Sequence, residues 1–178
     1  MNSREKEDFK EMVKTIGLSI IIAFGIALVV QPTTVNGQSM HPTLENKDYI
    51  IVNKLAYIRE MPNRGDVVTF KSNLINEKTG QRKNLVKRVI GLPGEHLEIK
   101  DNKVYINGKL LNESYIKGVD TEGDINIIVP DNNIFAMGDN RPESGDSRNS
   151  SIGTVEINDI IGCVAFRLFP FNKLGEVD

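Results

Sequence analysis

The chain has 178 residues and a formal net charge of −2. This length is about one domain's worth, enough to bury a hydrophobic core once a membrane segment is set aside. The near-neutral charge excludes the strong basic field typical of nucleic-acid binding, so we expect no nucleic-acid partner. The single cysteine, Cys163, cannot form an intrachain disulfide, and its apolar neighbours predict a packed strand position. His41 and His96 have no partner cysteine at metal-ligand spacing, so we expect no metal and no cofactor.

An apolar segment lies near the N-terminus. Residues 15–44 contain no Asp, Glu, Lys or Arg, and the most apolar part covers residues 16–30. A straight helix needs about 20 residues to cross the hydrocarbon of a bilayer, and this run is apolar on all faces, unlike a surface helix. We therefore predict a transmembrane anchor over residues 15–31. A cleavable secretory signal is the competing interpretation, but residues 31–35 lack a clear small-x-small cleavage site, which favours an uncleaved anchor.

The basic residues on the two sides of the anchor predict its direction. Those before it are Arg4, Lys6, Lys10 and Lys14. After it the first basic residue is Lys47, so the positive-inside rule places residues 1–14 in the cytoplasm as a tail. We then expect residues 32–178 to form an extracytoplasmic domain on the outer face of the cytoplasmic membrane, in a single-pass protein in contact with lipid. Ser39 follows Val30 by nine residues, which keeps it within about 30 Å of the apolar run.

The rest of the chain has the alternation of apolar and polar residues that is typical of strands. The runs cover residues 49–52, 66–70, 96–99, 103–106, 125–129, 134–137 and 160–169. Asp101-Asn102 and Asn107-Gly108 have the turn chemistry of hairpins, because Asn and Gly tolerate positive φ. The polar residues 71–84 are expected to form a loop or an exposed hairpin. We predict a mainly β fold of antiparallel sheets, preceded by one N-terminal transmembrane helix.

Two residues far apart in the sequence suggest a catalytic pair. Ser39 lies in the segment GQSMHPTL, and Lys87 lies in the segment KRVIGLPGE. A serine hydroxyl is a poor nucleophile until a base takes its proton, and a buried neutral lysine amine can be that base. An unperturbed lysine has a pKa of about 10.4, but burial can lower it by several units. Considered alone, a serine more often makes a local turn bond and a lysine more often lies on the surface.

The sequence resembles the type I signal peptidases, a family of Ser/Lys-dyad peptidases, in four separated blocks. These blocks cover residues 37–44, 64–68, 87–95 and 138–148. With the anchor, the resemblance covers most of the chain, and the small size resembles the compact forms typical of Gram-positive bacteria. It implies that Ser39 is the nucleophile of an acyl-enzyme and supplies a backbone N–H to the oxyanion, with Lys87 as general base. The implied substrates are exported preproteins, bound along a strand edge by signal peptides with small residues at P1 and P3.

The resemblance also implies residues that support this pair. Ser144 matches the serine whose hydroxyl hydrogen-bonds the lysine amine in that family. The other supporting positions are expected to brace the loop or shape the cleft, with Asp146 and Arg148 as an ion pair, and they are Met40, Arg88, Asp139, Asp146 and Arg148. Gly37 stands where some members have a serine that adds a side-chain oxyanion donor, so the second donor stays open.

Two other functions stay open beside signal peptide cleavage. The first is a self-cleaving Ser/Lys regulator, although such proteins carry a DNA-binding helical domain where this chain has an anchor. The second is a catalytically silent accessory that binds preproteins, although Ser39, Lys87 and Ser144 are all intact. Signal peptide cleavage is the leading hypothesis.

Overall fold

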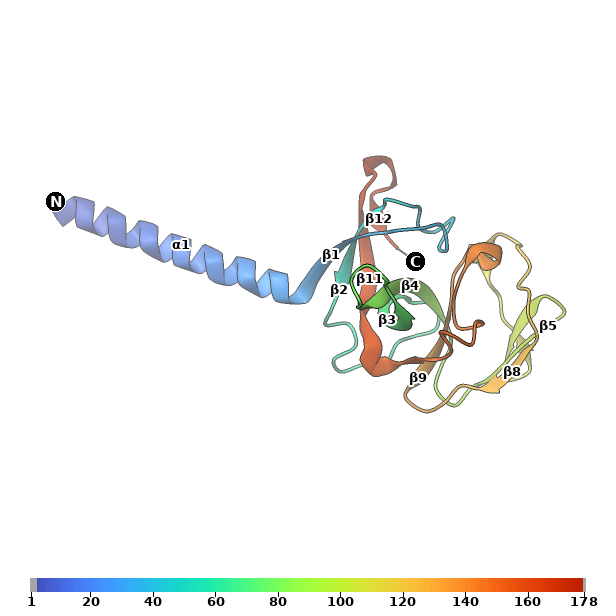
Figure 1. Cartoon of the computed structure of the whole chain (residues 1–178). Coiled ribbons are helices and arrows are strands. Elements are labelled where there is room, and N and C mark those ends of the chain that lie inside the picture. The colour runs from blue at the N-terminus through green and yellow to red at the C-terminus, as the bar shows by residue number, and fades with distance from the viewer. Residues whose placement is uncertain (1–2, 178) are drawn as a thin grey trace.

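The computed structural model describes residues 3–177, and its first element is a long helix, α1 (Ser3–Val29), which projects from a β-rich body (Figure 1). Within the described chain, one helical stretch is long and apolar enough to cross a membrane, Glu7–Val29, and it does not pack on the body. The helix starts well before the predicted anchor of residues 15–31, since Lys- and Glu-rich residues favour helix and Lys14 bonds Glu11 one turn back. It ends at Val29 because the next residues pair as a strand that includes Pro32. The predicted tail and catalytic domain also reach residues 1, 2 and 178, which lie outside the described residues.

The larger of two antiparallel sheets has eight strands. They are β1 (Val30–Thr34), β2 (Tyr49–Asn53), β3 (Val67–Ile75), β4 (Arg82–Gly91), β9 (Asn133–Met137), β10 (Val155–Glu156), β11 (Ile160–Phe169) and β12 (Gly175–Glu176). Their order is β1-β2-β11-β3-β4-β9-β10, and β12 pairs with β11. The last long strand of the chain therefore lies between two early ones. β3 and β4 continue into residues 71–84 as an exposed hairpin, one of the two forms expected there.

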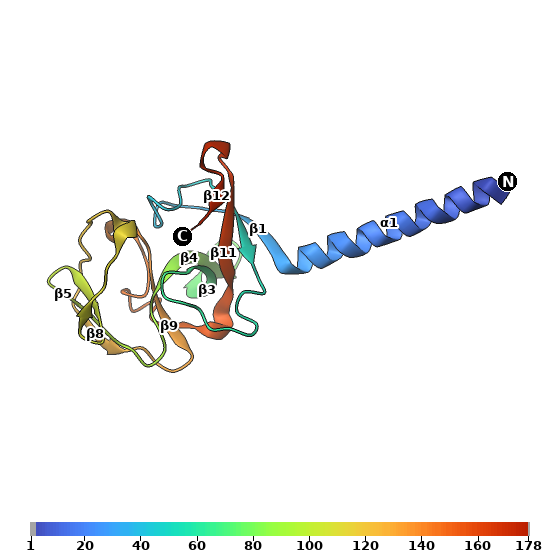
Figure 2. The same ribbon diagram turned by 180° about the vertical axis from the view of Figure 1, so that it is seen from behind.

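The smaller sheet has four strands in the order β7-β6-β5-β8. They are β5 (His96–Lys100), β6 (Lys103–Ile106), β7 (Lys109–Leu110) and β8 (Ile125–Ile128). The predicted turns are present, with positive φ at Asp101, Asn102, Asn107 and Gly108. This sheet lies on the side of the body away from α1, as Figure 1 and Figure 2 show from opposite directions. Four short 3₁₀ helices lie between strands: η1 (Ser114–Ile116), η2 (Arg141–Glu143), η3 (Ile157–Asp159) and η4 (Phe171–Lys173). The prediction of a mainly β, antiparallel fold after one apolar helix is confirmed.

The buried apolar side chains form separate clusters around β4. One joins β4 and β9 to the smaller sheet through Ile90, Phe135 and Leu97. Another contains Met40 and has Val86 of β4 packed against it. Cys163, which we expected to be packed in a strand, lies half-buried on β11. Because neighbouring residues of a strand point to opposite faces, Lys87 and Arg88 reach different surroundings from adjacent positions.

Candidate active site

Ser39 and Lys87 meet although 48 positions separate them. Ser39 lies in the turn that follows β1, and Lys87 lies in β4, opposite Val68 of β3. The Lys87 Nζ donates a hydrogen bond of 2.5 Å to the Ser39 Oγ. The lysine side chain crosses the packed interior to reach the serine, and the residue is only 2% exposed. A hydroxyl and an amine in direct contact are within the distance that proton transfer requires.

The surroundings of Lys87 favour an uncharged amine. Burial lowers the pKa of Lys87 from 10.5 to about 8, because an ammonium loses its hydration in the interior. The carboxylates of Asp146 and Asp139 oppose this shift, whereas the guanidinium of Arg148 adds to it. Desolvation is the largest of these influences, so a substantial fraction of the amine is neutral at mildly alkaline pH.

The turn that carries Ser39 is held by Asn140, which follows β9. The backbone N–H of Asn140 donates to the Ser39 carbonyl at 3.1 Å, and its side-chain amide donates to the Gln38 carbonyl at 3.1 Å. Farther along the turn, the Thr43 hydroxyl donates to the Asp139 carboxylate at 2.5 Å. Two consecutive residues after β9, Asp139 and Asn140, therefore hold the turn on both sides of Ser39.

Arg88 and Asp139 form a buried ion pair that joins β4 to this segment. The Arg88 Nε and Nη2 donate to the two Asp139 carboxylate oxygens at 2.9 and 2.7 Å. The Arg88 Nη1 also donates to the Gly65 carbonyl at 2.8 Å, and the guanidinium lies over the Tyr115 ring at 4.2 Å from its centroid. This two-pronged geometry fixes orientation as well as charge, so the pair braces the strand that carries Lys87.

Asp146 and Arg148 are paired as the sequence led us to expect. The Arg148 Nε and Nη2 donate to Asp146 at 2.9 Å each, and the backbone N–H of Gly138 donates to the same carboxylate at 3.0 Å. Although burial favours the neutral acid, bonds and charge from Arg148 hold the pKa of Asp146 below its usual range. Met40 is fully buried beside the turn, where it can shape the wall of the site.

Ser144 lies in the same loop and makes no hydrogen bond with the amine in the described chain. Its Oγ is buried and has no hydrogen-bond partner among residues 3–177. It lies against Gly138, where a Cβ would collide with this hydroxyl and with the Ser39 carbonyl. The hydrogen bond between Ser144 and the Lys87 amine therefore stays a prediction.

Three contributors to the site were missed by the sequence reasoning. Asn140 and Thr43 hold the serine turn, and Arg141 is buried between Glu113 and Thr121 below the same loop. All three lie in the blocks of residues 37–44 and 138–148, and this position was the only indication in the sequence that they contribute to the site. The contacts of Asn140 and Thr43 join segments about 100 residues apart, and those of Arg141 join segments 20 and 28 residues apart. Spacing within a motif does not reveal such contacts.

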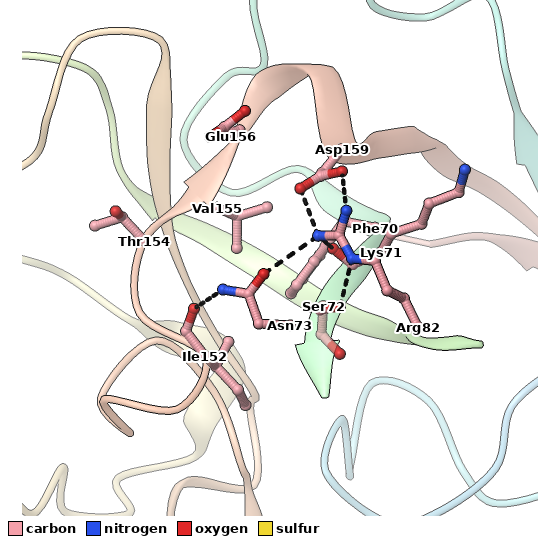
Figure 3. Close-up of a pocket in the computed structure, with 10 residues that line it drawn as sticks. All are labelled: Phe70, Lys71, Ser72, Asn73, Arg82, Ile152, Thr154, Val155, Glu156 and Asp159. Atoms are coloured by element: carbon pink, nitrogen blue, oxygen red, sulfur yellow. Dashed lines mark hydrogen bonds and ion pairs between the residues drawn. The ribbon is translucent and has the colours of Figure 1, made fainter. Parts of the chain in front are cut away.

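A small hollow on the surface is separate from this pair (Figure 3). It holds about 70 Å³ between β3, β4 and the segment around η3. The Arg82 guanidinium crosses it and donates to the Asp159 carboxylate at 2.6 and 2.7 Å. Since this ion pair satisfies both charges and none of the lining residues belongs to the serine–lysine site, the hollow is a structural feature.

A mainly β body that brings a serine hydroxyl to a buried lysine amine has the features of a serine peptidase. The sequence model of the family described as "Signal peptidase, peptidase S26" matches residues 9–169. The chain therefore belongs to this family, which consists of serine endopeptidases, and the prediction of an enzyme is confirmed.

Two sequence relatives agree with this assignment. Signal peptidase I of Leptolyngbya laminosa is 38% identical over 170 residues, covering 94% of this chain and 83% of that protein. Signal peptidase I S of Bacillus subtilis (strain 168) is 37% identical over 190 residues, covering 99% of this chain and 98% of that protein. A crystal structure of a signal peptidase I from Enterococcus faecalis V583 is 33% identical and covers 60% of this chain and 98% of that one, with a TM-score of 0.49.

Proposed function

We propose that this chain is a membrane-bound serine endopeptidase that cleaves N-terminal signal peptides from exported preproteins, with Ser39 as nucleophile and Lys87 as general base. Family membership supports signal peptide cleavage by a serine peptidase. The observation that carries the finer assignment is the 2.5 Å contact between the Lys87 Nζ and the Ser39 Oγ.

The proposed reaction has two stages. The Ser39 Oγ attacks the scissile carbonyl carbon while the Lys87 Nζ takes the hydroxyl proton. The ammonium then gives this proton to the departing amine, the C–N bond breaks, and the signal peptide is left as an ester on Ser39. A water molecule then attacks the ester while Lys87 takes its proton. The ammonium passes this proton to the Ser39 Oγ as the C–Oγ bond breaks, and the signal peptide leaves with a free carboxyl group. The lowered pKa of Lys87 supports both roles, since the amine must gain and lose a proton in each cycle.

The developing oxyanion requires a donor whose position is fixed in advance. We assign the backbone N–H of Ser39 as one donor. The bond from Asn140 to the Ser39 carbonyl supports this assignment, because it fixes the adjoining peptide unit. Gly37 adds no side-chain donor, and its φ of +108° is one that residues with a Cβ adopt at a cost.

The substrate is proposed to bind as an added strand beside the pair. β1 is the terminal strand of the larger sheet, so one of its edges has no strand partner in the described chain, and its backbone is open to β-augmentation. Val35, Met40 and Val86 adjoin the site and pack in one apolar cluster. Their packed side chains leave little depth, which supports a preference for small residues at P1 and P3.

We further propose that α1 anchors the enzyme with its N-terminus in the cytoplasm and its body on the outer face of the cytoplasmic membrane. The stretch Glu7–Val29 has 23 residues and so spans about 35 Å, against about 30 Å of hydrocarbon. The exposure of its apolar side chains supports contact with lipid.

The test compares full-length enzyme with Ser39→Ala and Lys87→Ala in detergent, using a preprotein substrate. Both variants should lose cleavage, and an acylating serine probe should label Ser39 only when Lys87 is present. Lys71→Ala, which changes an exposed lysine on the neighbouring strand, is the matched control and should cleave normally. Cleavage by folded Lys87→Ala would overturn the mechanism. Self-shortening without preprotein cleavage would favour the self-cleaving regulator, and an inert, unlabelled wild-type protein would favour the silent accessory.

A further inference from the structure

The segment of residues 54–61, which follows β2, presents three large apolar side chains to solvent. Leu55, Ile58 and Met61 are 46%, 67% and 50% exposed. Leu55 and Ile58 also line one open hollow on the surface. A group of exposed apolar side chains of this kind marks an interaction site. We propose that residues 54–61 dock on the surface of the lipid bilayer in which α1 is anchored, an inference that rests on the membrane anchoring proposed above.

The backbone of this segment is fixed with its apolar side chains turned outward. The Lys54 N–H donates to the Val29 carbonyl at 2.9 Å, which ties the start of the segment to the last residue of α1. In its middle, the Tyr57 hydroxyl donates to the Asp66 carboxylate at 2.7 Å and points inward. Tyr57 is half-buried while its neighbour Ile58 is exposed. These two hydrogen bonds therefore hold the segment in a conformation that keeps its apolar side chains exposed.

The position of the segment relative to α1 favours lipid over other occupants. A span ending at Val29 places that residue at the boundary between hydrocarbon and headgroups. Because Lys54 is bonded to Val29, the segment begins at the same depth, and the teal ribbon after β2 starts beside the base of α1 in both views (Figure 1, Figure 2). An interfacial segment buries its apolar side chains about 5–10 Å into this boundary.

The charges of the segment fit the same surface. Lys54 and Arg59 are exposed, and Glu60 is the one acidic residue in residues 54–61, which gives a net charge of +1. Basic side chains beside apolar ones allow the ammonium or guanidinium to meet anionic headgroups while the apolar atoms enter the boundary. The segment thus combines both kinds of contact that an anionic bilayer offers.

Nitroxide labels on the full chain test the docking directly. Ile58→Cys, Ile21→Cys in α1 and Ile128→Cys on β8 are each made with Cys163→Ala, labelled and placed in phosphatidylglycerol–phosphatidylethanolamine vesicles. Ile128 is 69% exposed on the smaller sheet and is the matched control. We expect labels 21 and 58 to be accessible to oxygen and shielded from a water-soluble relaxing agent, and label 128 to behave oppositely. A water-exposed label 58 beside a lipid-exposed label 21 overturns the docking and leaves the anchor intact. A water-exposed label 21 overturns the anchor and the docking together.

Activity provides an independent readout. We expect Ile58→Asp to lower kcat/KM about tenfold, equivalent to about 1.4 kcal/mol, for a preprotein embedded in the same vesicles. It should leave cleavage of a short soluble peptide unchanged, and Ile128→Asp should leave both unchanged. An equal loss on both substrates, or no loss on the embedded preprotein, overturns the proposal. The soluble peptide reports the Ser39–Lys87 chemistry alone, so failure of the docking is distinguishable from failure of the proposed function.

Discussion

The Lys87 amine can act as a base only while it is uncharged. With a pKa of about 8, its neutral fraction rises from about one tenth at pH 7 to about nine tenths at pH 9. We therefore expect kcat/KM for a soluble peptide to increase with pH through an apparent pKa near 8. Initial rates between about pH 6 and pH 10, with folding checked at each end by circular dichroism, measure this profile. A flat profile across this range would exclude Lys87 as the titrating base.

We expect Asn140 to affect catalysis through the residues it holds in place, Gln38 and Ser39. Asn140→Ala removes the hydrogen bond from the side-chain amide to the Gln38 carbonyl and keeps the hydrogen bond from the backbone N–H to the Ser39 carbonyl. Since small misplacements of a nucleophile are costly, we expect kcat to fall about tenfold or more while KM changes little. Separate determination of kcat and KM, with Asn126→Ala on the smaller sheet as control, tests this expectation. A change confined to KM would instead place Asn140 in substrate binding.

The residues that carry the proposed chemistry were predictable, and those that position them were not. Ser39 and Lys87 lie in motifs whose neighbours specify them, and the Asp146–Arg148 pair needs only two residues of separation. The contacts of Asn140 and Thr43 require knowledge of which segments lie side by side. The role of Ser144 stays a prediction from the resemblance, since its hydroxyl forms no hydrogen bond within residues 3–177.

At the scale of elements, the connection between β9 and η2 is packed too tightly for any added atom. A Cβ at Gly138 would meet the Ser144 Oγ and the Ser39 carbonyl. Gly138→Ala should therefore displace the serine turn and abolish most activity, with a loss of stability of about 1–3 kcal/mol from overpacking. Gly145→Ala is the matched control, because its Cβ would meet only Ile152 at 3.9 Å. Assays of peptide cleavage and thermal unfolding on both variants check this, and a fully active Gly138→Ala enzyme would contradict the geometry.

Strand positions and strand order differ in how far the sequence determines them. Alternating apolar residues and Asn- or Gly-containing turns predicted β2, β3, β5, β6, β8, β9 and β11 and the β5–β6 hairpin, because these depend on neighbours along the chain. The remaining strands were not predicted, among them β4, which carries Lys87. The placement of β11 between β2 and β3 depends on pairing across more than 90 residues, which no local pattern encodes. The helix α1 also begins well before the predicted anchor of residues 15–31. Its polar first turns continue a helix that the apolar run alone does not define.

The whole molecule carries a stability cost for keeping a lysine in its interior. The pKa of Lys87 is about 8 in the folded protein against 10.5 when unperturbed, so the unfolded chain binds more protons between these values. Stability should therefore rise as pH increases through this window. Relative to wild type, Lys87→Met should be more stable near pH 7 by about 3 kcal/mol, and this advantage should vanish above about pH 10.5. Calorimetry of both proteins in detergent at several pH values measures the difference, and an advantage independent of pH would contradict the linkage.

The central place of β11 in the larger sheet has a consequence for the chain during its synthesis. While the chain is being synthesised, the gap between β2 and β3 stays empty until residues 160–169 arrive. A nascent protein therefore contains both residues of the proposed Ser39–Lys87 pair without the completed sheet that brings them together. We therefore expect the protein to be inactive until its synthesis is complete, so a ribosome-stalled fragment ending before β11 should leave neighbouring precursors uncut.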